Sequence, residues 1–286
     1  MKKRTFLSKL HRNGLYCIIG ALILLLGVPL YQFLLLIPSG YSNALATQSL
    51  ALRWINAHSL LFLGYRALLI AGFAFIISLP FSLFRIIIAQ EVLGREEEDQ
   101  ERDEDEDASA EDEEDEEQEQ EEKVQSDKSD ADGMPEFAWR GKGYAVLAAW
   151  SGLIGLLLIV GGTLVSSLYL VSSAATITSQ TPISNSAAPL TGALAIITFT
   201  IGGGLLALSC LFFGAVIARS GLNLWPGIWV AFGYMALALA ALFSASAVEV
   251  AFAPTAGQAL LTTPAILLFA VWVLWFGVML IRLKPE

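Results

Sequence analysis

The sequence predicts an all-α fold: a polytopic membrane protein built as a six-transmembrane-helix bundle with a disordered acidic cytosolic loop. Apolar residues make up 55% of the 286 residues, whereas soluble domains usually contain about 45–50%. The mean hydropathy is +0.62. Six segments reach the length of about 20 apolar residues that a helix needs to cross the hydrocarbon core of a bilayer. The predicted spans are residues 15–37, 60–89, 144–171, 189–218, 226–246 and 264–283.

The number of these segments argues against a soluble protein. A buried core helix would account for one of them, but six leave almost no sequence from which to build a polar surface. The spans divide the chain into three parts. They are a first transmembrane hairpin (1–90) with its outer loop (38–59), the acidic loop (91–143), and a four-helix part made of two further hairpins (144–286).

The distribution of lysine and arginine gives the expected orientation, because cytoplasmic loops are enriched in both. With the N-terminus in the cytosol, 15 of the 17 lysine and arginine residues lie inside, and only Arg53 and Arg66 lie outside. Six crossings then place both termini in the cytosol. The basic N-terminus leads directly into a span, which predicts a bacterial-type plasma membrane (inner membrane). Signal-peptidase cleavage near residues 44–46 is the alternative, but the preceding apolar stretch is longer than in a usual signal peptide.

The acidic loop dominates the charge of the chain. Residues 96–122 contain 20 Asp and Glu and one Arg, a local charge of −19; because the whole chain carries −10, the rest carries +9. Such a segment repels itself and has no apolar area to bury, which predicts disorder. It is interpreted as a solvated spacer, as a docking segment for a basic cytosolic protein, or as a low-affinity cation binder without EF-hand spacing. Nucleic acid is not an expected partner, since phosphates would be repelled.

The first outer loop predicts a further short helix. Leu50, Trp54, Ala57 and Leu61 recur at helical spacing. This pattern is typical of a helix lying on the outer surface with Trp54 at the level of the lipid headgroups. It also fits an alternative in which these residues form the first turns of the second span.

The sequence gives no sign of an enzyme, and we expect neither a cofactor nor a metal. Its two histidines, His11 and His58, fall on opposite sides of the membrane in the predicted topology. No zinc-binding His-Glu-x-x-His helix, Gly-x-Ser-x-Gly elbow or phosphate-binding Gly-Lys-Ser/Thr loop is present. The spans also lack the pair of acidic residues that an intramembrane aspartyl protease requires.

Charges near the membrane mark a candidate outer polar site. A charged side chain inside the hydrocarbon is costly and is therefore a functional candidate by default. The candidate residues are Arg53, His58, Arg66 and Glu249. We expect Arg66 and Glu249 to form an ion pair at the outer membrane edge, which would make the second and fifth helices neighbours. The alternative is that each charge reaches the headgroups separately.

Small residues and prolines predict how the helices pack. Glycines recur in the third span at 152, 155, 161 and 162, and in the fourth at 202, 203 and 204. Small residues let helix backbones approach closely, so these two helices should pack tightly. Pro29 and Pro80 fall inside the first and second spans and should kink them. Polar residues in the spans, such as Thr198 and Ser209, should bond to backbone or to neighbouring helices.

Together these features favour a non-enzymatic membrane scaffold or accessory subunit. Its partners would be the lipid bilayer and a basic cytosolic protein that binds the acidic loop. A small membrane transporter or channel is the alternative. A transporter should carry polar, charged or helix-breaking residues in several spans around one site at the bilayer midplane, and this chain has few of them.

Overall fold

The computed structural model describes residues 2–44, 48–89, 136–176, 187–252 and 260–282. Every regular element in this part of the chain is a helix, and six helical spans are long and apolar enough to cross a membrane. The predicted all-α, six-span bundle is therefore confirmed. Most of the acidic loop, residues 90–135, lies outside the described residues.

Three of the six spans consist of more than one helical element. The first combines α1 (Lys2–Leu22), η1 (Ile23–Gly27), α2 (Val28–Tyr31) and η2 (Gln32–Leu36). The second combines α5 (Ser59–Ile76) with a helical segment over residues 79–89. The fourth combines α9 (Ala187–Ala195), η3 (Ile196–Ile201) and α10 (Gly202–Leu224). The others are the single helices α8 (Glu136–Ala175), α11 (Gly227–Phe252) and α12 (Thr262–Arg282).

Helix α8 begins before the part of it that can cross the membrane. The span begins at Gly143, one residue before the predicted start at residue 144. The helix itself starts at Glu136, inside the predicted acidic loop, which ends at residue 143. Pro135 directly precedes the helix in the sequence. Proline is tolerated at the start of a helix but not in its interior. The helix therefore begins at the first residue after Pro135.

The two prolines lie where the helices are interrupted. Pro29 lies in α2, between the π-helical segments η1 and η2. Pro80 follows a turn at residues 77–78 that separates α5 from the next helical segment. Proline has no N–H to donate and its ring crowds the preceding turn, which explains both interruptions and agrees with the predicted kinks.

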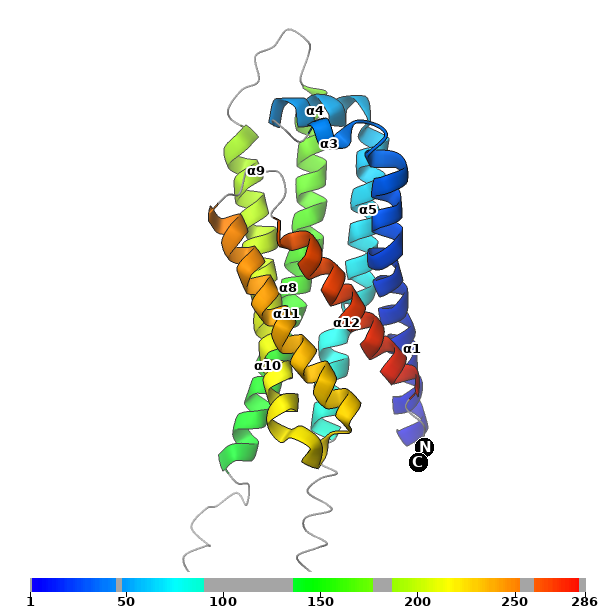
Figure 1. Ribbon diagram of the computed structural model, residues 1–286, viewed down its shortest axis with the longest axis vertical. Coiled ribbons are helices and arrows are strands. Elements are labelled where there is room, and N and C mark those ends of the chain that lie inside the picture. Colours follow the sequence, from blue (N-terminus) through cyan, green and yellow to red (C-terminus); the bar gives the residue numbers. More distant parts are fainter. Residues whose placement is uncertain (1, 45–47, 90–135, 177–186, 253–259, 283–286) are drawn as a thin grey trace, which may run out of the picture.

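The six spans form a closed ring in chain order. Helix α1 packs on α5, α5 on α8, α8 on α10, α10 on α11, α11 on α12, and α12 returns to α1. The start of α1 and the end of α12 lie at one end of the bundle, here called the terminal end (Figure 1). Two short helices, α3 (Tyr41–Ala44) and α4 (Gln48–Ala57), lie across the opposite end, here called the α4 end.

Glycines allow close contact at four of these six interfaces. A Cβ on Gly155 of α8 would come within 2.8 Å of the Gly202 carbonyl oxygen of α10, which confirms the tight packing predicted for the third and fourth spans. The other three interfaces pair glycines that the sequence analysis did not connect: Gly14 with Gly277 (α1 and α12), Gly20 with Gly72 (α1 and α5), and Gly214 with Gly233 (α10 and α11). In each pair a Cβ would come within about 3 Å of the other glycine's carbonyl oxygen.

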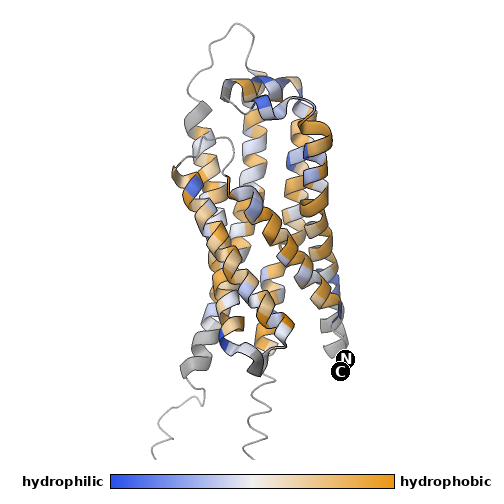
Figure 2. Cartoon of the chain, viewed as in Figure 1, coloured by the Kyte–Doolittle hydropathy of each residue, from blue (hydrophilic) through white to orange (hydrophobic). Residues whose placement is uncertain are grey.

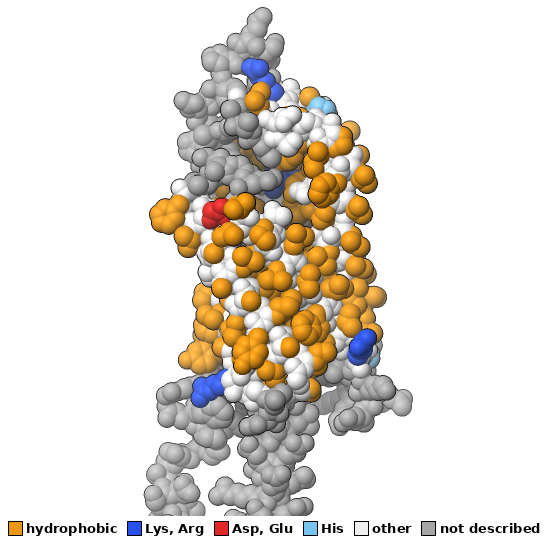
Figure 3. All heavy atoms as spheres, in the orientation of Figure 1, with side chains coloured by type: hydrophobic (Ala, Val, Ile, Leu, Met, Phe, Trp, Pro, Cys, Tyr) orange, Lys and Arg blue, Asp and Glu red, His pale blue; other side chains and the backbone are white. Residues whose placement is uncertain are grey.

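Aromatic side chains fill the interior between α11 and α12. The Phe232 and Trp272 rings stack with centroids 4.6 Å apart, and the Trp272 indole N–H donates to the Phe232 carbonyl oxygen at 3.2 Å. Phe269 of α12 lies between Phe73 of α5 and Phe243 of α11. The outer surface of the ring is also apolar around its middle, and charged side chains lie toward the ends (Figures 2 and 3). The face shown suits a lipid environment.

Candidate functional site

Helix α4 covers the α4 end of the bundle as a separate element. His58 breaks the chain between α4 and α5 with φ −129° and ψ 40°, so these residues do not continue the second span. The predicted short helix is thus correct, but its buried face is different from the predicted one. Leu52 and Ile55 are buried, whereas Leu50 is 46% exposed. The short periodic pattern does not show which face meets the bundle, because both faces carry apolar residues.

Trp54 anchors α4 to the rest of the protein and does not extend toward lipid headgroups. Its indole N–H donates to the Ser39 carbonyl oxygen at 2.8 Å. Its ring centroid lies 4.8 Å from that of Tyr41 and 5.0 Å from that of His58. The side chain is 8% exposed. A buried tryptophan requires a partner for its N–H, and this chain supplies that partner from the loop before α3.

A second hydrophobic core supports α4 from below. It joins η2, α4, α5 and α8, and is separate from the main core of the bundle. Three tyrosines pack against its edge with their rings. The buried members are Leu36, Leu52, Trp54, Ile55, Phe62 and Ala174, and the tyrosines are Tyr31, Tyr41 and Tyr65. The α4 end therefore has an apolar base from which several phenol hydroxyls emerge.

The structure separates two of the four residues of the predicted outer polar site, Arg66 and Glu249. Arg53 lies exposed on α4, and His58 stacks on Trp54. Arg66 lies on α5 and Glu249 on α11, and these helices are not adjacent in the ring. The structure contains no Arg66–Glu249 ion pair between these two described residues, so the expected pairing is wrong.

Glu249 bonds instead to the turn that begins α12. Its two carboxylate oxygens accept the backbone N–H groups of Leu260 and Leu261 at 2.7 and 2.9 Å. Backbone N–H groups at the start of a helix lack partners within the helix, and a negative charge there is favourable to the helix dipole. Both carboxylate oxygens therefore have hydrogen-bond partners, and these lie only 11 and 12 residues later in the chain.

Arg66 has no such partner. Its Nε is buried and makes no hydrogen bond within the described part of the chain. The guanidinium carbon lies 5.2 Å from the centroid of the Phe62 ring, in cation–π geometry. Phe62 is itself buried, so the guanidinium lies over the hydrophobic core that supports α4.

Two tyrosines, Tyr41 and Tyr65, are close enough to Arg66 to feel its charge. Gln32 Nε2 donates to the Tyr65 hydroxyl oxygen at 2.8 Å, which leaves the hydroxyl proton of Tyr65 free to donate. Burial raises the pKa of Tyr41, the nearby positive charge of Arg66 opposes this rise, and Tyr65 adds to it. Tyr41 therefore stays neutral and keeps its proton. We call Arg66, Tyr41, Tyr65 and Gln32 the Arg66 cluster.

The chemistry of this cluster is that of a binding site. A guanidinium and two phenol hydroxyls offer hydrogen-bond donors, and none of the three has an acceptor for these donors among the described residues. The sequence pattern indicated Arg66 but not the tyrosines. Tyr65 directly precedes Arg66 in the chain and could have been noticed for that reason. Tyr41 and Gln32 lie on other helical elements, so the sequence does not connect them with Arg66.

Several other polar groups in the spans bond within the bundle, as predicted. The Thr198 hydroxyl donates to the Leu194 carbonyl oxygen of its own span at 2.7 Å, and that of Thr200 to Ala247 at 3.1 Å. Ser209 of α10 donates to the Ala148 carbonyl oxygen of α8 at 2.7 Å. The Thr200 and Ser209 bonds join neighbouring helices, whereas the buried Ser78 hydroxyl of the second span makes no hydrogen bond within the described part of the chain.

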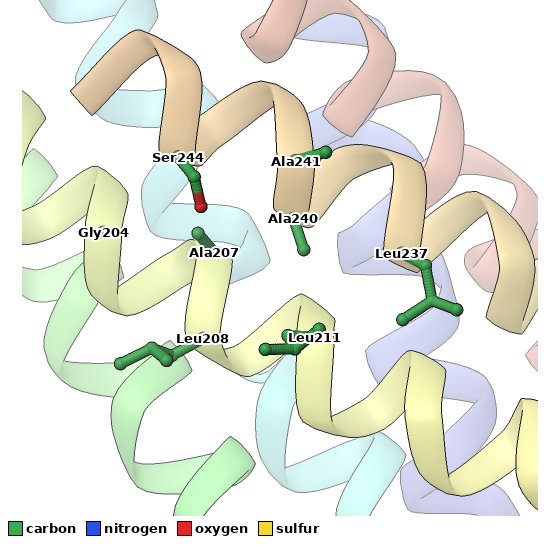
Figure 4. A pocket seen from close by; sticks show the side chains of 8 residues that line it. All are labelled: Gly204, Ala207, Leu208, Leu211, Leu237, Ala240, Ala241 and Ser244. Carbon is green, nitrogen blue, oxygen red and sulfur yellow. The ribbon is translucent and has the colours of Figure 1, made fainter. Parts of the chain in front are cut away.

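A partly open groove runs between α10 and α11 (Figure 4). It encloses about 250 Å³. Its lining is apolar apart from one hydroxyl and consists mainly of small and branched aliphatic residues: Gly204, Ala207, Leu208, Leu211, Leu237, Ala240, Ala241 and Ser244. The groove can hold an apolar chain but offers no catalytic group.

Comparisons with known proteins add no relative to this description. No protein-family model, curated protein or solved structure matches the chain. The functional conclusions therefore come from the residues and their geometry alone.

Proposed function

We propose that the protein is a non-enzymatic scaffold or accessory subunit of a bacterial-type plasma membrane, with both termini and the acidic loop in the cytosol. In this proposal the acidic loop, residues 91–143, binds a basic cytosolic protein. The bundle anchors and positions that loop. The observation that carries the proposal is the apolar, packed interior of the bundle.

The interior supports a structural role because large apolar side chains occupy it at mid-depth. Phe232, Phe269 and Trp272 are almost fully buried and in ring contact with one another. Transporters instead place ion-binding or substrate-binding polar groups near the bilayer midplane, between helices. The hydroxyls of Thr198, Thr200 and Ser209 bond to backbone carbonyls of their own or neighbouring helices.

The acidic run supports a docking role through its charge. Its net charge of −19 lies within 27 consecutive residues, 96–122. A dense single-sign charge attracts an oppositely charged protein over long distances and raises the rate of association. Salt weakens such attraction, since the screening length falls to about 3 Å at 1 M ionic strength.

The test compares the natural loop with a neutral loop of equal length. In the variant, every Asp and Glu of 96–122 is replaced by Asn or Gln. The purified natural protein should capture basic proteins from a cytosolic extract. The neutral variant should capture at least tenfold less of these proteins. Both forms should unfold at the same temperature in detergent, because the run has no apolar area to bury. Equal capture by both forms would contradict the docking role.

A small transporter is the second candidate, and the interrupted helices favour it. The first, second and fourth spans contain π-helical segments or a turn. Interruptions of this kind often occur at functional sites and line transport pathways. Reconstitution in liposomes loaded with an ion-sensitive dye distinguishes the two candidates. A scaffold gives no flux above that of empty liposomes, whereas a channel or ion transporter does.

A further inference from the structure

The Arg66 cluster combines a half-buried cation with unused donors, beneath the short helix α4. Arg66 Nε is buried and unpartnered among the described residues. The Tyr65 hydroxyl accepts from Gln32 and retains its own proton for donation. The Tyr41 ring packs at a tilt against Trp54, the residue that anchors α4. The cluster therefore consists of donors that converge from α3 and α5.

No carboxylate among the described residues supplies the missing acceptor. Of its 27 acidic residues, 25 lie in residues 91–136, which connect two helix ends at the terminal end of the bundle, and another is Glu286. The remaining one, Glu249, is bonded to Leu260 and Leu261. Residues 45–47, 177–186 and 253–259, which lie outside the described residues, contain no Asp or Glu.

A cation in this position favours an anion from outside the chain. Charged residues within membrane-spanning helices almost always have a partner or face a water-filled cavity. Arg66 is half-buried, with its Nε buried and unpartnered among the described residues and its guanidinium over Phe62. The fixed aromatic rings around it hold the donors in place before a ligand arrives, which reduces the entropic cost of binding.

We propose that the Arg66 cluster binds a phosphate group, with the Arg66 guanidinium and the Tyr41 and Tyr65 hydroxyls donating to its oxygens. Guanidinium groups bind phosphate through two parallel hydrogen bonds. A tetrahedral phosphate has further oxygens that point in other directions, and these can accept from donors on two separate elements. A planar carboxylate has only two oxygens. The phosphate comes either from a phospholipid headgroup or from a free ion, and the site is independent of the proposed scaffold role.

The experiment measures thermal unfolding of the full-length protein in detergent after lipid has been removed. One arm adds dihexanoyl phosphatidylglycerol, with dihexanoylglycerol as its phosphate-free control. The other arm adds sodium phosphate, with sodium chloride at equal ionic strength as its control. We expect one phosphate compound to raise the unfolding temperature by several degrees more than its control, and the arm that responds identifies the source.

Three variants test whether the Arg66 cluster is responsible. Arg66→Gln should weaken the phosphate response at least tenfold, and Tyr41→Phe should weaken it severalfold. Arg85→Gln is the matched control, because it removes an exposed arginine from the same span at the terminal end, and it should respond like the natural protein. The proposal is overturned if neither phosphate compound exceeds its control, or if Arg66→Gln responds like the natural protein. Should Arg66→Gln not fold, an undiminished response of Tyr41→Phe overturns it.

Discussion

At the scale of single residues, Glu249 and Arg66 differ in how the fold satisfies their charges. Glu249 accepts two backbone N–H groups at the turn before α12. Arg66 lies over Phe62 with a buried, unpartnered Nε. The two charges lie on different sides of the ring, so each acts on its own surroundings.

This separation predicts additive mutations. Glu249→Gln should lower the free energy of unfolding by on the order of 1 kcal/mol, because an amide replaces one carboxylate oxygen and cannot accept both N–H groups. Combined with Arg66→Gln, its effect should add to within about 0.5 kcal/mol, as expected for residues that share no partner. A double-mutant cycle, followed by thermal unfolding in detergent, measures this. A coupling well above 1 kcal/mol would show that the two side chains interact.

At the scale of elements, glycines determine how closely neighbouring helices approach. The pairs at the α1–α12 and α10–α11 interfaces follow the same arrangement as the Gly155–Gly202 pair of α8 and α10. Gly214 and Gly277 each follow a buried phenylalanine in a Phe-Gly pair near the end of a span. The similar sequences at these two helix ends therefore have a common packing role.

A matched pair of substitutions on α8 tests the role of the glycines. Gly155→Ala places a Cβ 2.8 Å from the Gly202 carbonyl oxygen and 3.0 Å from the Leu206 nitrogen, both backbone atoms that cannot move independently. We expect a loss of about 1–3 kcal/mol in stability, the usual cost of overpacking. Gly161→Ala meets no atom within 4 Å and should leave the unfolding temperature unchanged or slightly higher. Equal effects of the two substitutions would show that helix flexibility, and not close contact, matters.

At the scale of the whole molecule, an even number of spans brings the first and the last helix of the chain back to the same end of the bundle, the terminal end. Helix α1 begins there and α12 ends there, while α3 and α4 cover the opposite end (Figure 1). The excess of lysine and arginine predicts that the terminal end faces the cytosol. In that orientation the Arg66 cluster lies near the outer end of the bundle, beneath α4.

Cysteine labelling in intact cells tests this orientation. The natural cysteines, Cys17 and Cys210, are both buried and are first replaced by serine or alanine. A cysteine at Ser184 should then react with a membrane-impermeant maleimide added outside, because residues 177–186 connect helices at the α4 end. A cysteine at Ser129 should react only after the membrane is opened. Labelling of Ser129→Cys in intact cells would reverse the topology.

The sequence alone determined the fold class, the number of spans, the tight packing of α8 on α10 and the presence of a helix after the first span. These features depend on the local amino-acid composition and on the spacing of apolar and small residues, both of which can be recognised within one segment of the chain. The start of helix α8 at Glu136 was not predicted, because the apolar pattern marks only the part of the helix from about Gly143 onward.

Only the tertiary structure decided which charged and polar groups meet. The sequence pattern placed Arg66 and Glu249 at a similar depth, but depth does not give the position of a helix around the ring. The closed ring separates α5 from α11 and brings Tyr41 of α3 and Gln32 of η2 to Arg66. Side-chain contacts between helices depend on rotation and neighbour order, and these are fixed by packing across the whole bundle.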